Sequence, residues 1–393
     1  MSVAETAKPK TPLIYNPTVR GVAYQVLLCV LVVLLVWSAV SNAIENLARA
    51  RIASGFGFWE ATAGFDISQT LISYSTVSTY GRAFWVGLLN TLLVAVLGIV
   101  LATLLGFIIG IARLSRNWLV ARFASIYVEG IRNLPLLLQL LFWYNAVLKA
   151  LPAVRESVQI PGGVLLNNRG LFLPEPVVRP AFGIVVVALG IGLAAALIYR
   201  FIMKRRQMRT GEQAPVGWVT FGLVVGLPLV TLLVTGLPVD FNYPELGRFN
   251  IRGGVEVLPE FMALLFGLVI YTAAFIAEVV RAGIQSVSRG QTEAAYSLGL
   301  RPGPTLRLVV IPQAMRVIIP PLTSQYLNLT KNSSLAVAVG YPDLVQIFAG
   351  TVLNQTGQAV EVISITMAVY LTISLGTSAL MNWYNRRVAL VER

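Results

Sequence analysis

Residues Asn90–Ser115 read NTLLVAVLGIVLATLLGFIIGIARLS, and no charged residue interrupts this stretch before Arg113. An α-helix of about 20 mostly apolar residues is long enough to cross the hydrocarbon core of a bilayer. We therefore predict a membrane-spanning helix over 85–112.

The rest of the chain has the same character. Of its 393 residues, 56% are hydrophobic and only 12% are charged, and the mean hydropathy is +0.74. Soluble domains are roughly one quarter charged, so this composition indicates a polytopic membrane protein. Seven further apolar runs are long enough to cross: 21–43, 126–150, 181–203, 217–236, 256–283, 315–338 and 360–384. We expect an all-α bundle of about eight transmembrane helices.

The distribution of charge predicts the orientation. The net charge is +13, and most of it lies in alternate connections. The basic connections contain Arg113, Arg116 and Arg122, then Lys204, Arg205, Arg206 and Arg209, then Arg289, Arg301 and Arg307. Of the other segments, 44–84, 151–180 and 237–255 mix both signs, and 339–359 contains one acidic residue and no basic one. By the positive-inside rule the basic connections and both termini are expected in the cytoplasm. The polar run 315–338 must then cross, because otherwise Arg386 and Arg387 would end outside.

Several features exclude other classes of protein. The apolar run after the polar tail 1–20 is too long for a signal-peptide core, so we expect it to be kept as a span. The external segments 44–84 and 151–180 are expected to be loops with short interfacial helices. Cys29 is the only cysteine and the chain has no histidine. A disulfide framework, the usual zinc ligands and a Ser–His or Cys–His nucleophile are therefore excluded.

The connection that follows the apolar run 256–283 contains several residues that start or stop helices. Ser288–Gln291 fits a capping box, and Glu293 lies in the first turn of the helix that this box would start. Gly299 is expected to end that helix, and Pro302 and Pro304 prevent its continuation. Local chemistry thus predicts a short helix on the cytoplasmic side, and by itself it favours an ordinary connecting helix.

The longer spacing in this connection carries a resemblance. Its pattern closely resembles E-A-A-x3-G-x9-I-x-L-P, the EAA loop of ABC-importer permeases, with two conservative aliphatic replacements. The resemblance implies that the loop 284–312 carries a coupling helix that docks into a separate cytoplasmic ATPase. The coupling residues that it implies are Glu293, Ala294, Ala295, Gly299 and Pro312.

Further stretches resemble the polar amino-acid permeases, the HisMQ-like family. They are YVEGIRNLPLLLQLLFWYN (127–145), YTAAFIAEVVRAGIQSVSRGQTEAAYSLG (271–299), NLTKNSSLAVAVGYPDL (328–344) and the opening stretch. The extra first span and two inserted helices are similar to the general L-amino-acid branch, while Arg132-Asn133-Leu134-Pro135 departs from the commoner Arg-Gly-Thr-Pro. The resemblance implies a type I importer core in two parts, 85–150 and 256–384. The remaining parts are a tail (1–20), an extra helix and loop (21–84), an insertion (151–255) and a second tail (385–393).

Two pairs of opposite charges lie near expected cytoplasmic helix ends. Glu129 and Arg132 are three residues apart, as are Glu278 and Arg281. Such i, i+3 pairs are ordinary features of exposed helices. They are candidates for a structural or a gating role.

Lys331 falls inside an expected span, where an ammonium group must pair, reach the interface or face water. Its polar neighbours could line a hydrated path or bind the carboxylate of a substrate. They could equally hold neighbouring helices together by hydrogen bonds. The candidates for a translocation path or substrate site are Asn90, Gln139, Asn328, Lys331, Asn332, Ser333 and Ser334.

The resemblance implies a transmembrane subunit of an ATP-driven importer for L-amino acids, in the bacterial inner membrane. The implied partners are a second related permease, two ATPase subunits and a periplasmic amino-acid-binding protein. The chain has no G-x-x-x-x-G-K-[ST] motif, so ATP and Mg are expected on the ATPase and no cofactor on this chain. We expect no enzymatic activity of its own. An importer for another polar solute and a stand-alone transporter or channel remain alternatives, and a membrane enzyme or scaffold would need a catalytic cluster that is not apparent.

Overall fold

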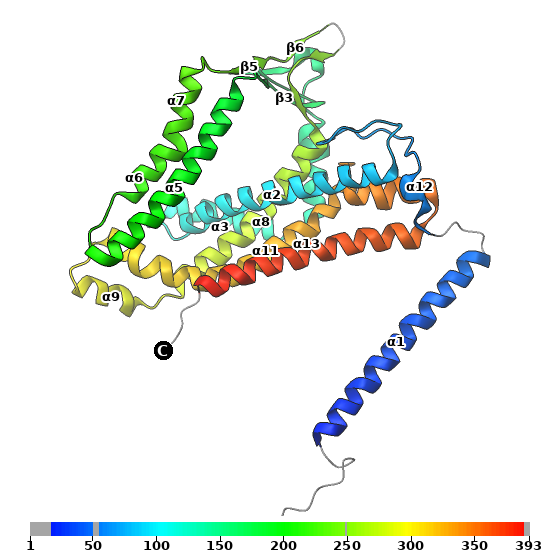
Figure 1. Cartoon of the computed structure of the whole chain (residues 1–393), viewed down its shortest axis with the longest axis horizontal. Helices are drawn as coiled ribbons and strands as arrows, with labels where there is room; N and C mark the ends of the chain where they lie inside the picture. The colour runs from blue at the N-terminus through cyan, green and yellow to red at the C-terminus, as the bar shows by residue number, and fades with distance from the viewer. Residues whose placement is uncertain (1–16, 50–54, 248–249, 389–393) are drawn as a thin grey trace, which may run out of the picture. The chain divides into compact units, whose positions relative to one another are not determined.

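The computed structural model describes residues 17–49, 55–247 and 250–388, and helices dominate it (Figure 1). The α-helices are α1 Pro17–Arg49, α2 Tyr80–Ala112, α3 Trp118–Arg132, α4 Leu136–Leu141, α5 Phe182–Thr210, α6 Val216–Phe221, α7 Leu227–Val234, α8 Pro259–Gln285, α9 Arg289–Ser297, α10 Pro302–Thr305, α11 Ile311–Asn332, α12 Leu353–Thr356 and α13 Ala359–Val388. Short 3₁₀ helices cover Phe56–Glu60, Val154–Glu156 and Ser333–Ala338. π-helical stretches cover Phe142–Leu148, Gly222–Gly226, Leu306–Val310 and Val345–Val352.

The expected membrane bundle is confirmed. Seven helices of the described chain are long and apolar enough to cross a bilayer: Val19–Asn42, Tyr80–Ala112, Phe182–Thr210, Val216–Val234, Pro259–Gln285, Pro302–Ala338 and Ala359–Arg386. A shorter apolar helix covers Leu136–Leu148. The polar run 315–338 is helical as predicted, because it lies within the continuous helix Pro302–Ala338.

The single span expected over 126–150 is wrong. The chain forms α3, breaks at Asn133–Pro135 and starts again as α4. Pro135 has an extended backbone (φ −57°, ψ 133°), and a proline disfavours the helical conformation in the residue before it. Gln139 stabilises the break, because its Nε2 donates to the carbonyl oxygens of Ile131 and Leu134 at 3.0 Å each.

The chain divides into two compact units. The first contains residues 1–93, 326–337 and 342–393. Its core joins the start of α2 to the segment before α13 through aromatic rings. Phe84 lies 5.1 Å from Trp59 and 5.3 Å from Phe348, measured between ring centroids, and Phe58 and Val86 are buried beside them.

The second unit contains residues 94–325 and 338–341, and α8 lies at its centre. Gly106 and Gly110 of α2 bring the two helices into close contact. A Cβ at Gly106 would lie 2.6 Å from the side chain of Ile276, and one at Gly110 would lie 2.8 Å from that of Val280. Small residues four apart permit this approach in membrane helices. α3 is fixed to α8 by Tyr127, whose hydroxyl donates to the carbonyl oxygen of Ile270 at 2.6 Å.

The segment 151–180 differs from the expectation of loops with short interfacial helices. It forms strands, which pair antiparallel with strands that precede α8. One sheet has the order β1 (Val158–Ile160), β2 (Val164–Asn167), β3 (Gly170–Leu173) and β8 (Val255–Val257). The two ribbons pair β4 (Glu175–Val178) with β5 (Val239–Asn242) and β6 (Glu245–Leu246) with β7 (Ile251–Arg252). Gly162 and Gly163 have positive φ (94° and 76°) and form the turn between β1 and β2.

The two inserted helices expected over 181–203 and 217–236 are present, and they form a hairpin. α5 packs against the returning helix, α6 to α7, through the stripe Val185, Ala188, Gly192 and Ala196. The closest approach is at Gly192, where a Cβ would lie 2.1 Å from the carbonyl oxygen of Leu223. β4 and β5 continue the same hairpin, and Arg179 holds their junction with two hydrogen bonds to the carboxylate of Asp240 (2.6 and 2.7 Å).

Candidate functional site

Four of the five predicted coupling residues lie on the short helix α9 or just after it, and Pro312 lies in α11. Gly299 ends α9 with φ 79°, and its N–H donates to Tyr296 O while that of Leu300 donates to Ala295 O. This is the Schellman arrangement, which needs a left-handed residue at the position that Gly299 occupies. The predicted end of the helix is therefore confirmed.

The capping box expected at the start of α9 is wrong. Ser288 is the N-cap residue and has the expected extended backbone (φ −62°, ψ 142°), but its side chain makes no capping hydrogen bond. Gln291, the other half of the expected box, accepts at Oε1 from Gln313 Nε2 at 3.3 Å. Its side chain therefore links α9 to the start of α11.

The outer surface of α9 is small and mixed in character. Glu293 and Ala294 are exposed, whereas Ala295 is buried within the chain. Leu298, at the end of the helix, is 82% exposed and Tyr296 is 49% exposed. A carboxylate, a methyl group and two large side chains are thus exposed on α9.

Pro312 lies at the second position of α11, directly after the π-helical stretch Leu306–Val310. A proline inside a continuous helix removes one N–H donor, and its ring collides with the carbonyl group four residues before it. A local π-turn relieves that collision. The π-helical stretch thus gives the ring of Pro312 room within the continuous helix Pro302–Ala338.

Glu278 lies among three arginines in the second unit. Its carboxylate contacts Arg281 of the same helix and Arg113 at the end of α2, and Arg132 lies 3.9 Å away at the end of α3. The Arg113 side chain is only 11% exposed. The carboxylate therefore joins the ends of three helices, and a gating role for this cluster stays a prediction.

The predicted pairing of Glu129 with Arg132 does not form in the described part of the chain. Arg132 instead turns toward α8, where its guanidinium group lies 5.0 Å from the ring centre of Phe275. A stacked position beside Glu278 offers Arg132 both a cation–π contact and a carboxylate. Glu129 is exposed.

Lys331 and Ser334 line a cavity of about 430 Å³ in the first unit. The other lining residues are Val345, Thr366, Met367, Tyr370, Leu371 and Ser374. The cavity therefore combines the ammonium group of Lys331 with four hydroxyl groups and an apolar wall. The hydroxyls belong to Ser334, Thr366, Tyr370 and Ser374. This mixture can accommodate a small zwitterion, because the ammonium attracts a carboxylate and the hydroxyls donate or accept.

The neighbours of Lys331 use their hydroxyls locally. Thr330 donates to Tyr326 O, Ser333 to Thr330 O and Ser334 to Lys331 O, at 2.9, 2.7 and 2.7 Å. Asn328 is exposed and Asn332 is half-buried. Of this group, the structure brings only Lys331 and Ser334 to the cavity.

Asn90 and Gln139 are buried in packing positions. Asn90 Nδ2 donates to the carbonyl oxygens of Gln69 and Pro342 at 2.9 and 2.8 Å, and Gln139 holds the break after α3 as described above. Both amides thus stabilise irregular backbone. A contact of either with a transported solute stays a prediction.

Asp343 and the polar face of α13 were not predicted from the sequence. Asp343 is fully buried; it accepts from the Gln346 N–H at 2.8 Å and from the Tyr370 hydroxyl at 3.1 Å. Burial raises the pKa of Asp343 to about 7. Thr366, Tyr370 and Ser374 are four residues apart, which is a helical period, and that spacing in an apolar run could have identified them.

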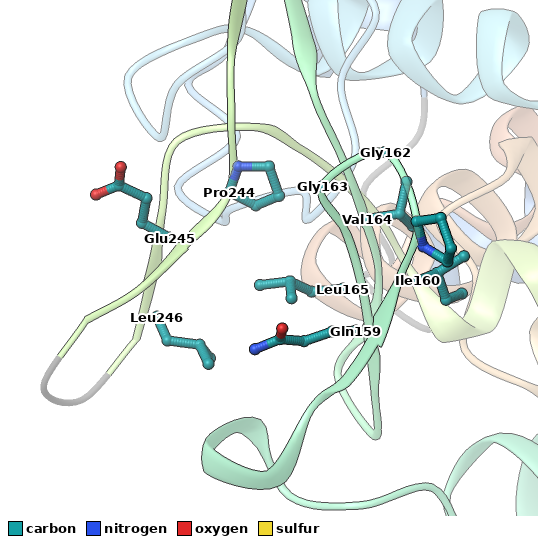
Figure 2. Close-up of a pocket in the computed structure, with 10 residues that line it drawn as sticks. Gln159, Ile160, Gly162, Gly163, Val164, Leu165, Pro244, Glu245 and Leu246 are labelled. Carbon is teal, nitrogen blue, oxygen red and sulfur yellow. The ribbon is translucent and has the colours of Figure 1, made fainter.

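A second hollow of about 610 Å³ lies between the β1–β2 turn and the segment Pro244–Leu246 (Figure 2). Figure 2 shows Gln159, Leu165 and Leu246 directed toward it, whereas the carboxylate of Glu245 points away. The side chains around it do not form a charged or nucleophilic cluster in this part of the chain. Among the described residues no group of three or more metal-ligating side chains occurs either.

Comparison with known proteins gives the family of the chain. Residues 98–390 match the family described as "Binding-protein-dependent transport system inner membrane component". The chain belongs to this family. The permease is 53% identical to the "General L-amino acid transport system permease protein AapQ" of Rhizobium johnstonii, over 96% of this chain and 94% of the relative.

Two other relatives match the permease over nearly its whole length. It is 52% identical to the "Putative amino-acid ABC transporter permease protein YhdX" of Escherichia coli, over 96% of each chain. It is 45% identical to the "Glutamate/glutamine/aspartate/asparagine transport system permease protein BztB" of Rhodobacter capsulatus, over 97% of this chain and 96% of that one. The resemblance inferred from the motifs is therefore confirmed, and the permease is a multi-pass inner-membrane protein.

Proposed function

We propose that the permease forms part of the path of an ATP-driven importer for L-amino acids, of broad specificity. The similarity to AapQ over nearly the whole of both chains carries this proposal. The cavity beside Lys331 supports it, because an ammonium group and several hydroxyls suit the charged backbone of an amino acid. L-amino acids that differ only in their side chains would all keep these contacts, which is what broad specificity requires.

Coupling to ATP hydrolysis is assigned to α9. Its exposed face, with Glu293, Ala294 and Leu298, is short enough to enter a groove of a partner. Gly299 sets the angle at which the chain leaves the helix. ATP and Mg belong to two separate ATPase subunits, and this chain binds no cofactor.

The remaining partners follow from the same assignment. A second, related permease completes the path, and a periplasmic binding protein delivers the amino acid. The charge pattern supports cytoplasmic termini and a cytoplasmic α9. The partners and the orientation are parts of the proposal.

The test of coupling compares two glycines. Gly299→Ala places a side chain at φ 79°, which costs about 1 kcal/mol and shifts the exit of α9. Gly303→Ala, four residues on, has open space for its Cβ and serves as the matched control. In proteoliposomes with all partners, Gly299→Ala and Glu293→Ala should reduce uptake per ATP hydrolysed or release the ATPase. Normal uptake by both variants would refute the role of α9.

The test of substrate uses the same vesicles and a panel of acidic, basic, polar and apolar L-amino acids. Uptake and stimulated ATP hydrolysis should follow several of them, and Lys331→Gln should raise KM more than it lowers kcat. Lys331→Arg, which keeps the cation, should retain more of the affinity. If no amino acid stimulates hydrolysis while another polar solute does, the substrate assignment fails and the coupling assignment stands.

A further inference from the structure

The last turns of α5 extend beyond the membrane-spanning part of the helix. Residues 182–199 carry no charge, and at 1.5 Å per residue they cover about 27 Å, close to the thickness of the hydrocarbon core. The helix continues to Thr210. Its final 11 residues, 200–210, therefore lie at the depth of the lipid headgroups and beyond.

Five cations surround this part of α5, and we name them the basic collar: Arg200, Lys204, Arg205, Arg206 and Arg209. All five are exposed. Glu212 is the only acidic residue within 200–212, and it lies 2.9 Å from Arg206. The collar therefore carries an excess of four positive charges at one level of the membrane.

Three of the five collar cations face away from the returning helix of the hairpin. At 3.6 residues per turn, Lys204, Arg205 and Arg209 lie roughly a quarter-turn or more from the stripe that packs on the returning helix. Arg206 lies nearer that stripe, on the side of Glu212. Favourable interaction with the helix dipole accounts for cations in the last turn, but not for Arg200 and Lys204, which lie further back.

Large apolar side chains are exposed at the same end of the hairpin. Trp218, in the first turn of α6, is 80% exposed, and Phe201 and Met208 of α5 are 57% and 83% exposed. The guanidinium group of Arg205 lies 4.3 Å from the ring centre of Phe201. Exposed aromatic rings among cations are typical of the membrane interface, where the rings enter the boundary of the acyl chains and the cations meet phosphate. An acidic protein partner would leave the rings unexplained.

We propose that the basic collar, together with Trp218, binds the phosphate headgroups of anionic phospholipids. The chemistry is complementary: several guanidinium groups and one ammonium group meet a layer of phosphate oxygens, beside rings that pack on the glycerol region. The collar thereby anchors the inserted hairpin to one leaflet. This role is separate from transport and from α9.

The experiment uses the full-length chain in phosphatidylcholine vesicles that contain, as a minority lipid, brominated phosphatidylglycerol or brominated phosphatidylcholine. Bromine quenches indole fluorescence at short range, and the difference between the wild type and Trp218→Phe isolates Trp218. We expect brominated phosphatidylglycerol to quench Trp218 roughly two- to fivefold more than brominated phosphatidylcholine at the same fraction, an excess that salt reduces. The triple variant Lys204→Gln/Arg205→Gln/Arg209→Gln should lose this preference.

Two controls keep the result interpretable. Arg116→Gln/Arg122→Gln removes exposed cations from another connection and should leave the preference intact. Lys204→Arg keeps the charge and should retain the preference for phosphatidylglycerol. Equal quenching by the two lipids in the wild type, or a preference that survives the triple variant, would overturn the proposal. If the wild type shows no lipid preference and the triple variant no longer co-purifies with its ATPase, the collar is a protein contact and the lipid assignment is wrong.

Discussion

The helices α8 and α5 are similar in length and apolarity but differ in their surroundings. Two thirds (67%) of the most apolar window of α8 is buried within the chain, against 22% for α5. Gly106 and Gly110 let α2 approach α8, whereas Gly183 and Gly190 of α5 have open space beside them. Hydropathy thus places both helices in the membrane, and the extent to which other helices pack around each one determines which becomes a centre of packing.

The largest expected effect comes from filling the α2–α8 contact. Gly106→Leu would drive a side chain into Ile276, and we expect a loss of more than about 3 kcal/mol of stability, with poor recovery of folded protein. Gly190→Leu adds the same atoms to an open face of α5 and should be tolerated. Thermal melting of the purified variants measures both. Equal melting temperatures would show that the α2–α8 contact is not tight.

Removal of a carboxylate should lower stability much more in the region of α8 than in the α5 hairpin. Glu278→Gln leaves Arg113, which is nearly buried, without its anion, and we expect a loss of about 2 kcal/mol together with weaker coupling. Glu212→Gln breaks the exposed pair with Arg206 on the hairpin and should change the melting temperature little. Chemical or thermal denaturation tests the contrast. A similar small change in both variants would mean that the cluster around Glu278 is not structural.

The buried carboxyl group of Asp343 should make the stability of the protein depend on pH. The folded protein holds a proton on Asp343 up to about pH 7, whereas the unfolded chain releases it near its ordinary pKa of 3.8. The contribution of Asp343 to the free energy of unfolding is therefore largest below about pH 4. It decreases by about 1.4 kcal/mol per pH unit until about pH 7. Asp343→Asn should remove this slope. Melting curves across the range test it, and parallel slopes in both proteins would contradict the burial of a titrating carboxyl.

The smallest effect is expected on the outer face of α5. Leu197 is 68% exposed to whatever surrounds the hairpin, so Leu197→Ala should change stability by less than about 0.5 kcal/mol. Val185→Ala, in the packed stripe of the same helix, should cost about 1 kcal/mol. Melting temperatures in lipid measure the difference. A larger loss for Leu197→Ala would reveal a protein neighbour on that face.

Much of the candidate site was predictable from local patterns. The short helix α9 and its end at Gly299 follow from residues close together in the chain, because a Schellman turn is a local structure. The β hairpin at Pro161–Gly163 also had a local signal, which is two glycines between apolar runs. The break at Pro135 was likewise visible as a proline within an apolar run.

The sequence by itself determined the membrane class, most of the helical segments, the family resemblance and the position of the short helix α9. Each of these depends on composition or on spacing within a few turns. Only the tertiary structure decided that Lys331 shares a cavity with Tyr370, that Asp343 is buried beside it, and that Arg132 turns to Glu278 and not to Glu129. Those contacts join residues that are distant in the chain or that have several possible partners. Their geometry is set by how whole helices pack, which no local pattern encodes.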